Sequence, residues 1–259
     1  MRPVLLEIGF ISIHSWSFMF ALAVALVLLL SFKYAPQENI KYHLGKHTDK
    51  VVDYALEAFL LGLILVALGS RLYYVISYPE QFVEAPWWEI FAFWRGGMVF
   101  HGGMFAVVIG EAIYCHYRKL PFLETMDYLI PFVSLGYAVA RIGCFLNGCC
   151  YGHETDLPWG MVFPVLDNAA RHPTQLYSFV AVLFIAFILR KLWHVSRYDG
   201  HVFSWFLLLY GTYRLLVEFL RVDPDVLWIL STAQLVSIGF ILVGGAVLLY
   251  KRKHLQKQQ

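Results

Sequence analysis

The sequence predicts an all-α integral membrane protein with about seven transmembrane helices, an external N-terminus and a cytoplasmic C-terminus. Of the 259 residues, 59% are hydrophobic and only 15% are charged, and the mean hydropathy is +0.62. A soluble domain is nearer half apolar and a quarter charged. The aromatic content of 17% agrees, because Trp and Tyr gather at membrane interfaces. The net charge of +2 gives no indication of a nucleic-acid partner.

A transmembrane helix needs about 20 apolar residues, and seven segments meet this requirement. They are 15–33, 54–77, 98–116, 124–146, 175–193, 201–220 and 232–250. The fourth is the weakest, because it is interrupted by Pro131, Gly136, Arg141 and Gly143. The first follows few charges and precedes no small-residue cleavage site, so we expect an anchor rather than a cleaved signal peptide. No soluble domain fits between the segments, which predicts a single polytopic membrane domain, 1–259.

The basic residues predict the orientation. With the N-terminus outside, 13 of the 20 basic residues, including every lysine, lie in inner connections or the tail. Cytoplasmic loops are enriched in this way. The 13 are Lys33, Lys41, Lys46, Lys50, Arg118, Lys119, Arg190, Lys191, Arg197, Lys251, Arg252, Lys253 and Lys257.

The other seven basic residues are all arginines on the outer side or in the outer half of a predicted helix: Arg2, Arg71, Arg95, Arg141, Arg171, Arg214 and Arg221. Arginine binds phosphate or carboxylate through two parallel hydrogen bonds, so several at one depth indicate a site for an anionic group. The alternative is pairing with Asp and Glu on the same side, which we expect for Arg2 and Arg221. It is less expected for Arg141 and Arg214, which are embedded in apolar helix.

Three motifs accompany these arginines. Glycine pairs flank His101 in Arg95–Gly103, where a histidine can accept a proton or cap the helix. Arg171–Tyr177 places Pro173 where a first helical turn tolerates proline. In Tyr210–Arg221, the side chains of Tyr210, Arg214 and Glu218 recur every four residues and share one helix face. Arg214 and Glu218 could neutralise each other, which is compatible with a role for Arg214.

Three of the four cysteines cluster in Cys144–Cys150. The spacing of Cys144, Cys149 and Cys150 matches no standard zinc motif, and we expect adjacent cysteines not to serve one tetrahedral site easily. A redox pair on the outer face and plain packing around a turn both remain open. Cys115 is expected to pack near the inner side.

The motifs taken together resemble the prolipoprotein diacylglyceryl transferase family of bacterial membranes. The resemblance covers nearly the whole chain in one order. Its parts are His14-Ser-Trp16, Gly69-Ser-Arg71, Arg95–Gly103, Arg141–Gly152, Arg171–Tyr177, Tyr210–Arg221 and Ser231-Thr-Ala-Gln234. It implies transfer of the diacylglyceryl group of phosphatidylglycerol to the lipobox cysteine thiol of a prolipoprotein signal peptide. A thioether forms and glycerol phosphate leaves. It also implies the bacterial cytoplasmic (inner) membrane, no metal or soluble cofactor, and no nucleic-acid partner.

The resemblance also implies site residues. By matched position, His101 is the base for the substrate thiol, and Arg141 and Arg214 hold the phosphate and stabilise the leaving group, with Tyr210 nearby. The residues implied in substrate binding are Arg71, Gly102, Gly103, Asn147, Gly148, Arg171, His172, Gln175 and Glu218.

This chain departs from the family pattern at three positions. Cys144 stands where Asn is usual, Cys149 where an acid or amide is usual, and Trp16 where Tyr is usual. Two other functions use the same residues. An anionic-solute transporter would use the arginines, although the two halves show no repeat. A membrane redox protein would use the cysteines.

Overall fold

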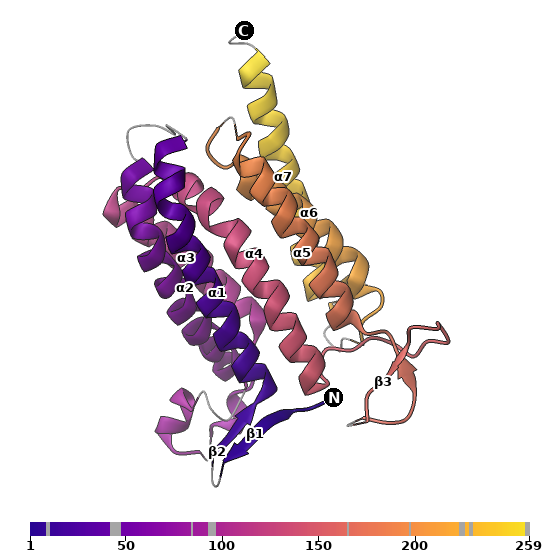
Figure 1. Ribbon diagram of the computed structural model, residues 1–259. Helices are drawn as coiled ribbons and strands as arrows, with labels where there is room; N and C mark the ends of the chain where they lie inside the picture. The colour runs from indigo at the N-terminus through magenta and orange to yellow at the C-terminus, as the bar shows by residue number, and fades with distance from the viewer. Residues whose placement is uncertain are drawn as a thin grey trace. The chain divides into compact units, whose positions relative to one another are not determined.

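A computed structural model describes residues 1–8, 11–41, 48–83, 85–92, 97–164, 166–196, 198–222, 226–227 and 230–256. The chain divides into two compact units, which are described separately: residues 1–34 with 126–259, and residues 35–125. Seven α-helices lie in the described residues (Figure 1). They are α1 Ser15–Lys41, α2 Thr48–Ser77, α3 Phe100–Arg118, α4 Phe122–Asn147, α5 Thr174–Trp193, α6 His201–Glu218 and α7 Thr232–Gln256.

Each predicted segment coincides with one helix. Five of the helices are long and apolar enough to cross a membrane: Ser15–Tyr34, Glu57–Ser77, Phe122–Asn147, Thr174–Trp193 and Thr232–Lys251. The protein is therefore a multi-pass membrane protein built from helices. The segment predicted to be weakest is one continuous helix, α4, because Pro131 lies inside it without ending it.

Three short antiparallel ribbons were not predicted. They are β1 Val4–Ile8 with β2 Ile11–His14, β3 Met161–Val162 with β4 Ala170–Arg171, and β5 Val226–Leu227 with β6 Leu230–Ser231. Their strands have two to five residues, too few for an alternating pattern to stand out in an apolar sequence. They connect or precede the helices.

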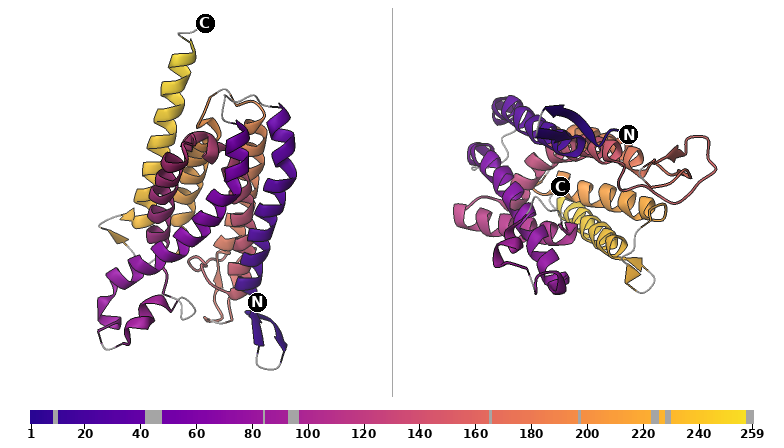
Figure 2. Two further views of the ribbon diagram at one scale, coloured as in Figure 1. Left: turned by 90° about the vertical axis from the view of Figure 1, so that its left-hand side faces the viewer. Right: turned by 90° about the horizontal axis from the view of Figure 1, so that it is seen from below.

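In the larger unit, α5, α6 and α7 lie side by side, as both views in Figure 2 and the contacts show. Small residues allow the close approach of α6 and α7. A Cβ atom at Gly211 would meet the Ser237 carbonyl oxygen, and one at Gly244 would meet the Ser204 carbonyl oxygen. The backbones of α7 and of α6, which carries Arg214, are therefore in close contact.

α4 joins α1, α5 and α6 through a few specific contacts. The Tyr128 hydroxyl donates to the Ser31 carbonyl oxygen at 2.8 Å, and its ring packs on Trp193 at 5.8 Å. Asp127 accepts hydrogen bonds from the backbone N–H groups of Gly200 (2.8 Å) and Phe203 (2.7 Å). A carboxylate there satisfies the otherwise unpaired N–H groups at the start of α6. The N-terminal ends of α4 and α6 are thereby fixed to each other.

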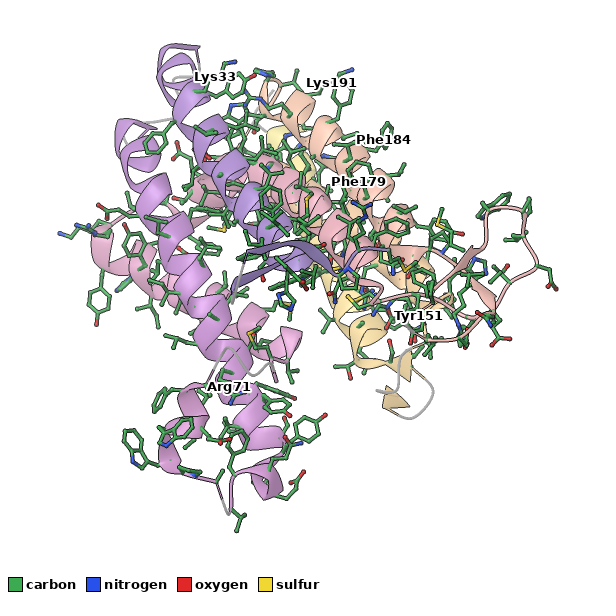
Figure 3. All side chains as sticks on the ribbon, turned by 60° about the horizontal axis from the view of Figure 1, so that its bottom comes forward. Lys33, Arg71, Tyr151, Phe179, Phe184 and Lys191 are labelled. Carbon is green, nitrogen blue, oxygen red and sulfur yellow. The ribbon has the colours of Figure 1, made fainter. Side chains whose placement is uncertain are left out.

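The two ends of the larger unit differ in character. Lys33, in the C-terminal part of α1, and Lys191, in the last turn of α5, lie at one end, and Tyr151, beyond α4, lies at the other (Figure 3). The connections that follow α4 and α6 gather at the Tyr151 end. That end holds the candidate site.

The smaller unit consists of α2, α3 and two 3₁₀ segments, η1 Pro79–Gln81 and η2 Trp87–Phe91. α2 and α3 touch along glycines. A Cβ at Gly102 would meet the Gly69 carbonyl oxygen, and a Cβ at Gly103 would meet the Ser70 hydroxyl. Two of the glycines predicted to bind substrate are therefore where the two helices approach most closely.

Candidate active site

The turn after α4 is a Schellman motif. Asn147 ends the helix and Gly148 follows with φ +73°, a left-handed conformation that glycine adopts without steric cost. The Gly148 N–H donates to the Phe145 carbonyl oxygen (3.1 Å), and the Cys149 N–H donates to the Cys144 carbonyl oxygen (3.2 Å). These two bonds satisfy the last carbonyl groups of the helix. Gly148, predicted to bind substrate, therefore reverses the chain, and Asn147 stays half-exposed beside it.

Arg141 lies seven residues before Gly148, about two helical turns, and has no carboxylate partner among the described residues. Its guanidinium donates to the Tyr137 hydroxyl and lies over the Tyr137 ring, 4.6 Å from the ring centroid. Its Nε is buried without a hydrogen-bond partner. Arg141 makes no ion pair with any residue that the structure describes. A cation in a membrane-spanning helix that lacks an ion pair is a candidate binding residue for an anion.

Tyr210 connects Arg141 with α6. Its hydroxyl donates to the Tyr137 hydroxyl at 3.3 Å, and the two rings meet edge to face at 5.8 Å. Both Arg141 and Arg214 interact electrostatically with Tyr210. Two of the residues predicted to be catalytic therefore lie close to Tyr210, and all three belong to one unit of the fold.

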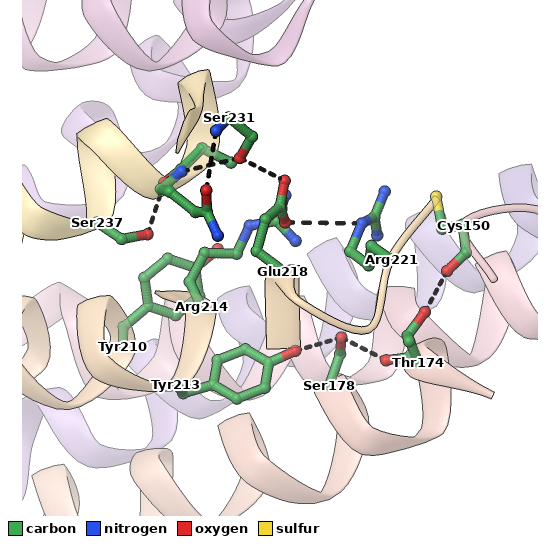
Figure 4. Close-up of polar contacts among 12 residues, drawn as sticks. Cys150, Thr174, Ser178, Tyr210, Tyr213, Arg214, Glu218, Arg221, Ser231 and Ser237 are labelled. Atoms are coloured by element: carbon green, nitrogen blue, oxygen red, sulfur yellow. Dashed lines mark hydrogen bonds and ion pairs between the residues drawn. The ribbon is translucent and has the colours of Figure 1, made fainter. Parts of the chain in front are cut away.

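Arg214 is held by Glu218, as one of the two sequence interpretations expected. Their ion pair measures 2.8 Å, and the Glu218 side chain is only 2% exposed (Figure 4). The other Glu218 oxygen accepts a hydrogen bond from the Ser231 hydroxyl at 2.9 Å. Ser231 and Gln234 form the capping box of α7, with the Gln234 N–H donating to Ser231 and the Ser231 N–H donating to Gln234. The start of α7 thus fixes Glu218, and Glu218 fixes Arg214.

Arg221 also lies near this carboxylate, 3.8 Å from Glu218, as the pairing alternative expected. Arg2, for which pairing was also expected, makes no ion pair among the described residues. Arg141, Arg214 and Arg221 thus bring three guanidinium groups, and Glu218 one buried carboxylate, to this part of the unit.

The start of α5 secures the turn after α4. Gln175 is fully buried and its amide donates to the Cys149 carbonyl oxygen. The Thr174 hydroxyl donates to the Cys150 carbonyl oxygen at 2.5 Å (Figure 4). His172 contacts the Tyr177 hydroxyl through its Nδ1 at 3.2 Å. Gln175 and His172, both predicted to bind substrate, therefore lie at this turn, and Gln175 uses its amide N–H to hold the backbone there.

Arg171 has carboxylate partners, unlike Arg141. It pairs with Asp167 at 2.7 Å and with Glu154 at 2.9 Å. The Arg171 guanidinium lowers the pKa of Asp167 below its ordinary value, and Asp167 raises the pKa of Arg171 in turn. The geometry gives Arg171 a role in holding the β3–β4 ribbon, and its predicted contact with substrate remains a prediction.

The sulfur atoms of the three clustered cysteines converge, and no fourth ligand that would make a tetrahedral site joins them among the described residues. The Sγ atoms of Cys144, Cys149 and Cys150 all lie within 4.8 Å of one another. The reason is the backbone: Gly148 and Cys150 have φ +73° and +62°, and two left-handed residues so close together fold the chain back on the helix end. All three cysteines are unpaired by disulfides.

The remaining predicted residues belong to the other unit. Arg71 of α2 donates to three carbonyl oxygens: those of Ile90 (3.0 Å), Gly97 (3.1 Å) and Glu89 (2.6 Å). It is buried, and it holds the backbone of η2 and of Gly97. The His101 side chain lies outside the described residues.

Several site residues were missed by the sequence analysis. Tyr137 lies four residues before Arg141 and so shares its helix face, a spacing that could have identified it. Tyr213 donates to the Ser178 hydroxyl, and it precedes Arg214 directly. Ser231 belongs to the Ser231-Thr-Ala-Gln234 motif, and its spacing to Gln234 is that of a capping box. Its contact with Glu218 could not be read from either helix alone.

Comparison with known proteins agrees with the resemblance. A sequence model described as prolipoprotein diacylglyceryl transferase matches residues 3–250. Proteins named phosphatidylglycerol–prolipoprotein diacylglyceryl transferase from Bordetella parapertussis and Nitrosomonas europaea are each 37% identical, over 96% and 97% of this chain and 94% and 90% of their own. The one from Legionella pneumophila (strain Lens) is 35% identical over 94% of both chains. The predicted family is thereby confirmed: this chain belongs to the prolipoprotein diacylglyceryl transferase family.

Proposed function

We propose that this chain transfers the diacylglyceryl group of phosphatidylglycerol to the lipobox cysteine thiol of a prolipoprotein, and that Arg141 binds the phosphate that becomes the leaving group. The names of its relatives supply the reaction. The observation that supports the role of Arg141 is its lack of an ion pair in the described part of a multi-pass membrane protein. Phosphatidylglycerol carries the anionic group that such a residue can bind.

Arg214 completes the phosphate site in this proposal. Glu218 compensates part of the positive charge of Arg214. It also fixes the direction of the guanidinium, so Arg214 loses less conformational freedom when the phosphate binds. Tyr137 contributes a hydroxyl group bonded to Arg141, and Tyr210 contributes one that interacts electrostatically with both arginines. Hydrogen-bond donors that are already in place where negative charge develops make the largest single contribution to the rate enhancement of many enzymes.

The reaction forms one bond and breaks one. The thiolate of the substrate cysteine attacks the diacylglyceryl carbon that bears the phosphate oxygen. A C–S bond forms while the C–O bond breaks, and the electron pair leaves with glycerol phosphate. His101 takes the thiol proton, as the resemblance implies. Arg141 and Arg214 stabilise the additional negative charge on the departing phosphate. The nucleophile belongs to the substrate, so the chain's own cysteines do not react.

The topology follows from the same proposal. All seven helices cross the bacterial inner membrane as one domain, 1–259, with the N-terminus outside and the C-terminus in the cytoplasm. Lys33 and Lys191 lie at the end opposite Tyr151, in agreement with an inner lysine-rich face (Figure 3). The arginine site then lies toward the outer leaflet.

The test is incubation of the purified protein with phosphatidylglycerol vesicles and a lipobox peptide, followed by mass spectrometry of the peptide. We expect the peptide mass to increase by one diacylglyceryl group and glycerol phosphate to appear in equal amount. A peptide with Ser in place of the lipobox Cys is the control and should stay unmodified. An unmodified Cys peptide, with uptake of an anionic solute into proteoliposomes, would support a transporter instead.

A further inference from the structure

The three cysteines at the end of α4 form a compact cluster of sulfur atoms that the proposed reaction does not use. Cys144 lies in the last turn of α4, and Cys149 and Cys150 lie in the turn that follows. Each of the three side chains is half-buried, and none forms a disulfide. Only one is engaged with the backbone, through the Cys149 thiol, which donates to the Cys144 carbonyl oxygen at 3.6 Å. Three thiols that meet at one point are the donor set of a thiophilic metal ion.

The distances fit a single ion. A metal–thiolate bond of about 2.3 Å places three sulfur atoms roughly 4.0 Å apart when the ion lies in their plane. The Sγ atoms lie within 4.8 Å of one another. A small rotation of the cysteine side chains closes the difference. The backbone carbonyl oxygens of Cys149 and Cys150 are held by Gln175 and Thr174, so the turn itself is already fixed.

The ligand set indicates which ion. No histidine or carboxylate joins the three thiols to make a fourth ligand in the described part of the chain. Structural zinc sites use four ligands, whereas soft thiolates also select Cu⁺, which accepts fewer. Arg141 and Arg221 interact electrostatically with the Cys150 sulfur. Three soft thiolates without a fourth ligand among the described residues therefore favour Cu⁺.

We propose that Cys144, Cys149 and Cys150 form a three-thiolate binding site for Cu⁺. Three S–H protons pass to solvent and three Cu–S bonds form, with no change in oxidation state. Cys144 lies three residues after Arg141 on α4, so the bound ion would restrain the helix turn that carries the phosphate-binding residue. Inhibition of transfer by Cu⁺ follows as a consequence, and only this consequence depends on the proposed function.

The experiment measures binding without lipid or peptide. The purified full chain is kept anaerobic and reduced, and Cu⁺ is titrated against a chromophoric Cu⁺ chelator. We expect one Cu⁺ per chain. Cys144→Ser, Cys149→Ser and Cys150→Ser should each raise the dissociation constant on the order of 100-fold or more, because each removes one of three ligands. Cys115→Ser is the matched control, and it should bind as the wild type does. Each variant is checked for a single elution peak and an unchanged melting temperature.

Three results would overturn the proposal. One is Cu⁺ binding that persists in the three cluster variants, which would indicate an adventitious ion only. The second is loss of binding in Cys115→Ser. The third is tighter binding of Zn²⁺ than of Cu⁺ in the same competition, which would require a fourth ligand. Because no substrate is present, absence of Cu⁺ binding would leave the transferase proposal intact, and absence of transfer would leave the metal site intact.

Discussion

The buried carboxylate of Glu218 offers a sharp test of how the site is held. Glu218→Gln keeps the shape of the side chain and one acceptor for the Ser231 hydroxyl, but it removes the negative charge. Arg214 at 2.8 Å and Arg221 at 3.8 Å then lose a buried counter-charge. We therefore expect a large loss of stability that arises from charge and not from packing.

The magnitude follows from these two distances. At an effective dielectric constant of about 20, the Coulomb energies are roughly 6 and 4 kcal/mol before desolvation is subtracted. Removing one partner of a buried ion pair costs about 3–5 kcal/mol net, because the remaining charge is uncompensated. For a chain of this size, 1 kcal/mol corresponds to about 2–4 °C in melting temperature. The melting temperature should therefore fall by roughly 10 °C.

The assay is thermal unfolding in detergent, followed by tryptophan fluorescence. Glu154→Gln is the matched control, because that carboxylate is 65% exposed and should give no measurable change. The double variant Glu218→Gln with Arg214→Gln removes the guanidinium charge that lies closest to residue 218 and should recover part of the loss. A Glu218→Gln protein that melts with the wild type, or a double variant less stable than Glu218→Gln alone, would refute this reasoning.

Three further predictions test other parts of the site. Gly148→Ala forces a side chain into a left-handed conformation and should destabilise the protein by about 1–2 kcal/mol in thermal unfolding, whereas Gly148→Asn should cost less; equal stabilities would contradict the Schellman turn. Tyr137→Phe removes the hydroxyl that contacts Arg141 and should lower kcat in the lipidation assay about tenfold while the melting temperature stays within a few degrees; an unchanged kcat would remove Tyr137 from the site. Because Arg171 lowers the pKa of Asp167, this pair stabilises the β3–β4 ribbon above the unfolded pKa and is lost as the pH falls through the lower folded pKa. Limited proteolysis of residues 154–171 should therefore accelerate in acid in the wild type but be fast at all pH values in Asp167→Asn, and equal pH profiles would argue against the pair.

The helices could be predicted because the mean hydropathy of a window of about 20 residues identifies a segment long enough to cross a membrane. All seven predicted segments coincide with helices, and α6 was found although Arg214 and Glu218 interrupt its apolar run. Ribbons such as β3–β4 were missed because strands of two residues have no periodicity to detect.

The site could be predicted only in part, because the sequence around each arginine is compatible with two roles: binding an anionic substrate, or pairing with an Asp or Glu of the protein itself. Arg141 and Arg171 look alike as external arginines beside glycines or aromatic residues. The structure separates them, since Arg171 has two carboxylate partners and Arg141 has none among the described residues. The convergence of the cysteines depends on the φ angles at Gly148 and Cys150, which spacing does not encode. Side-chain pairing between helices and left-handed turns are tertiary features that a single sequence leaves open.

The most direct test of the central claim is the rate of diacylglyceryl transfer by Arg141→Ala and Arg141→Lys. Loss of a donor to a developing oxyanion typically lowers kcat by about 10²–10³-fold, so we predict a loss of this size for Arg141→Ala. Arg141→Lys should recover only part of it, because an ammonium group lacks the planar fork. Arg118→Ala, at an exposed pair with Glu57, is the control and should react as the wild type does. Transfer at the wild-type rate by a folded Arg141→Ala protein would contradict the claim that Arg141 binds the phosphate.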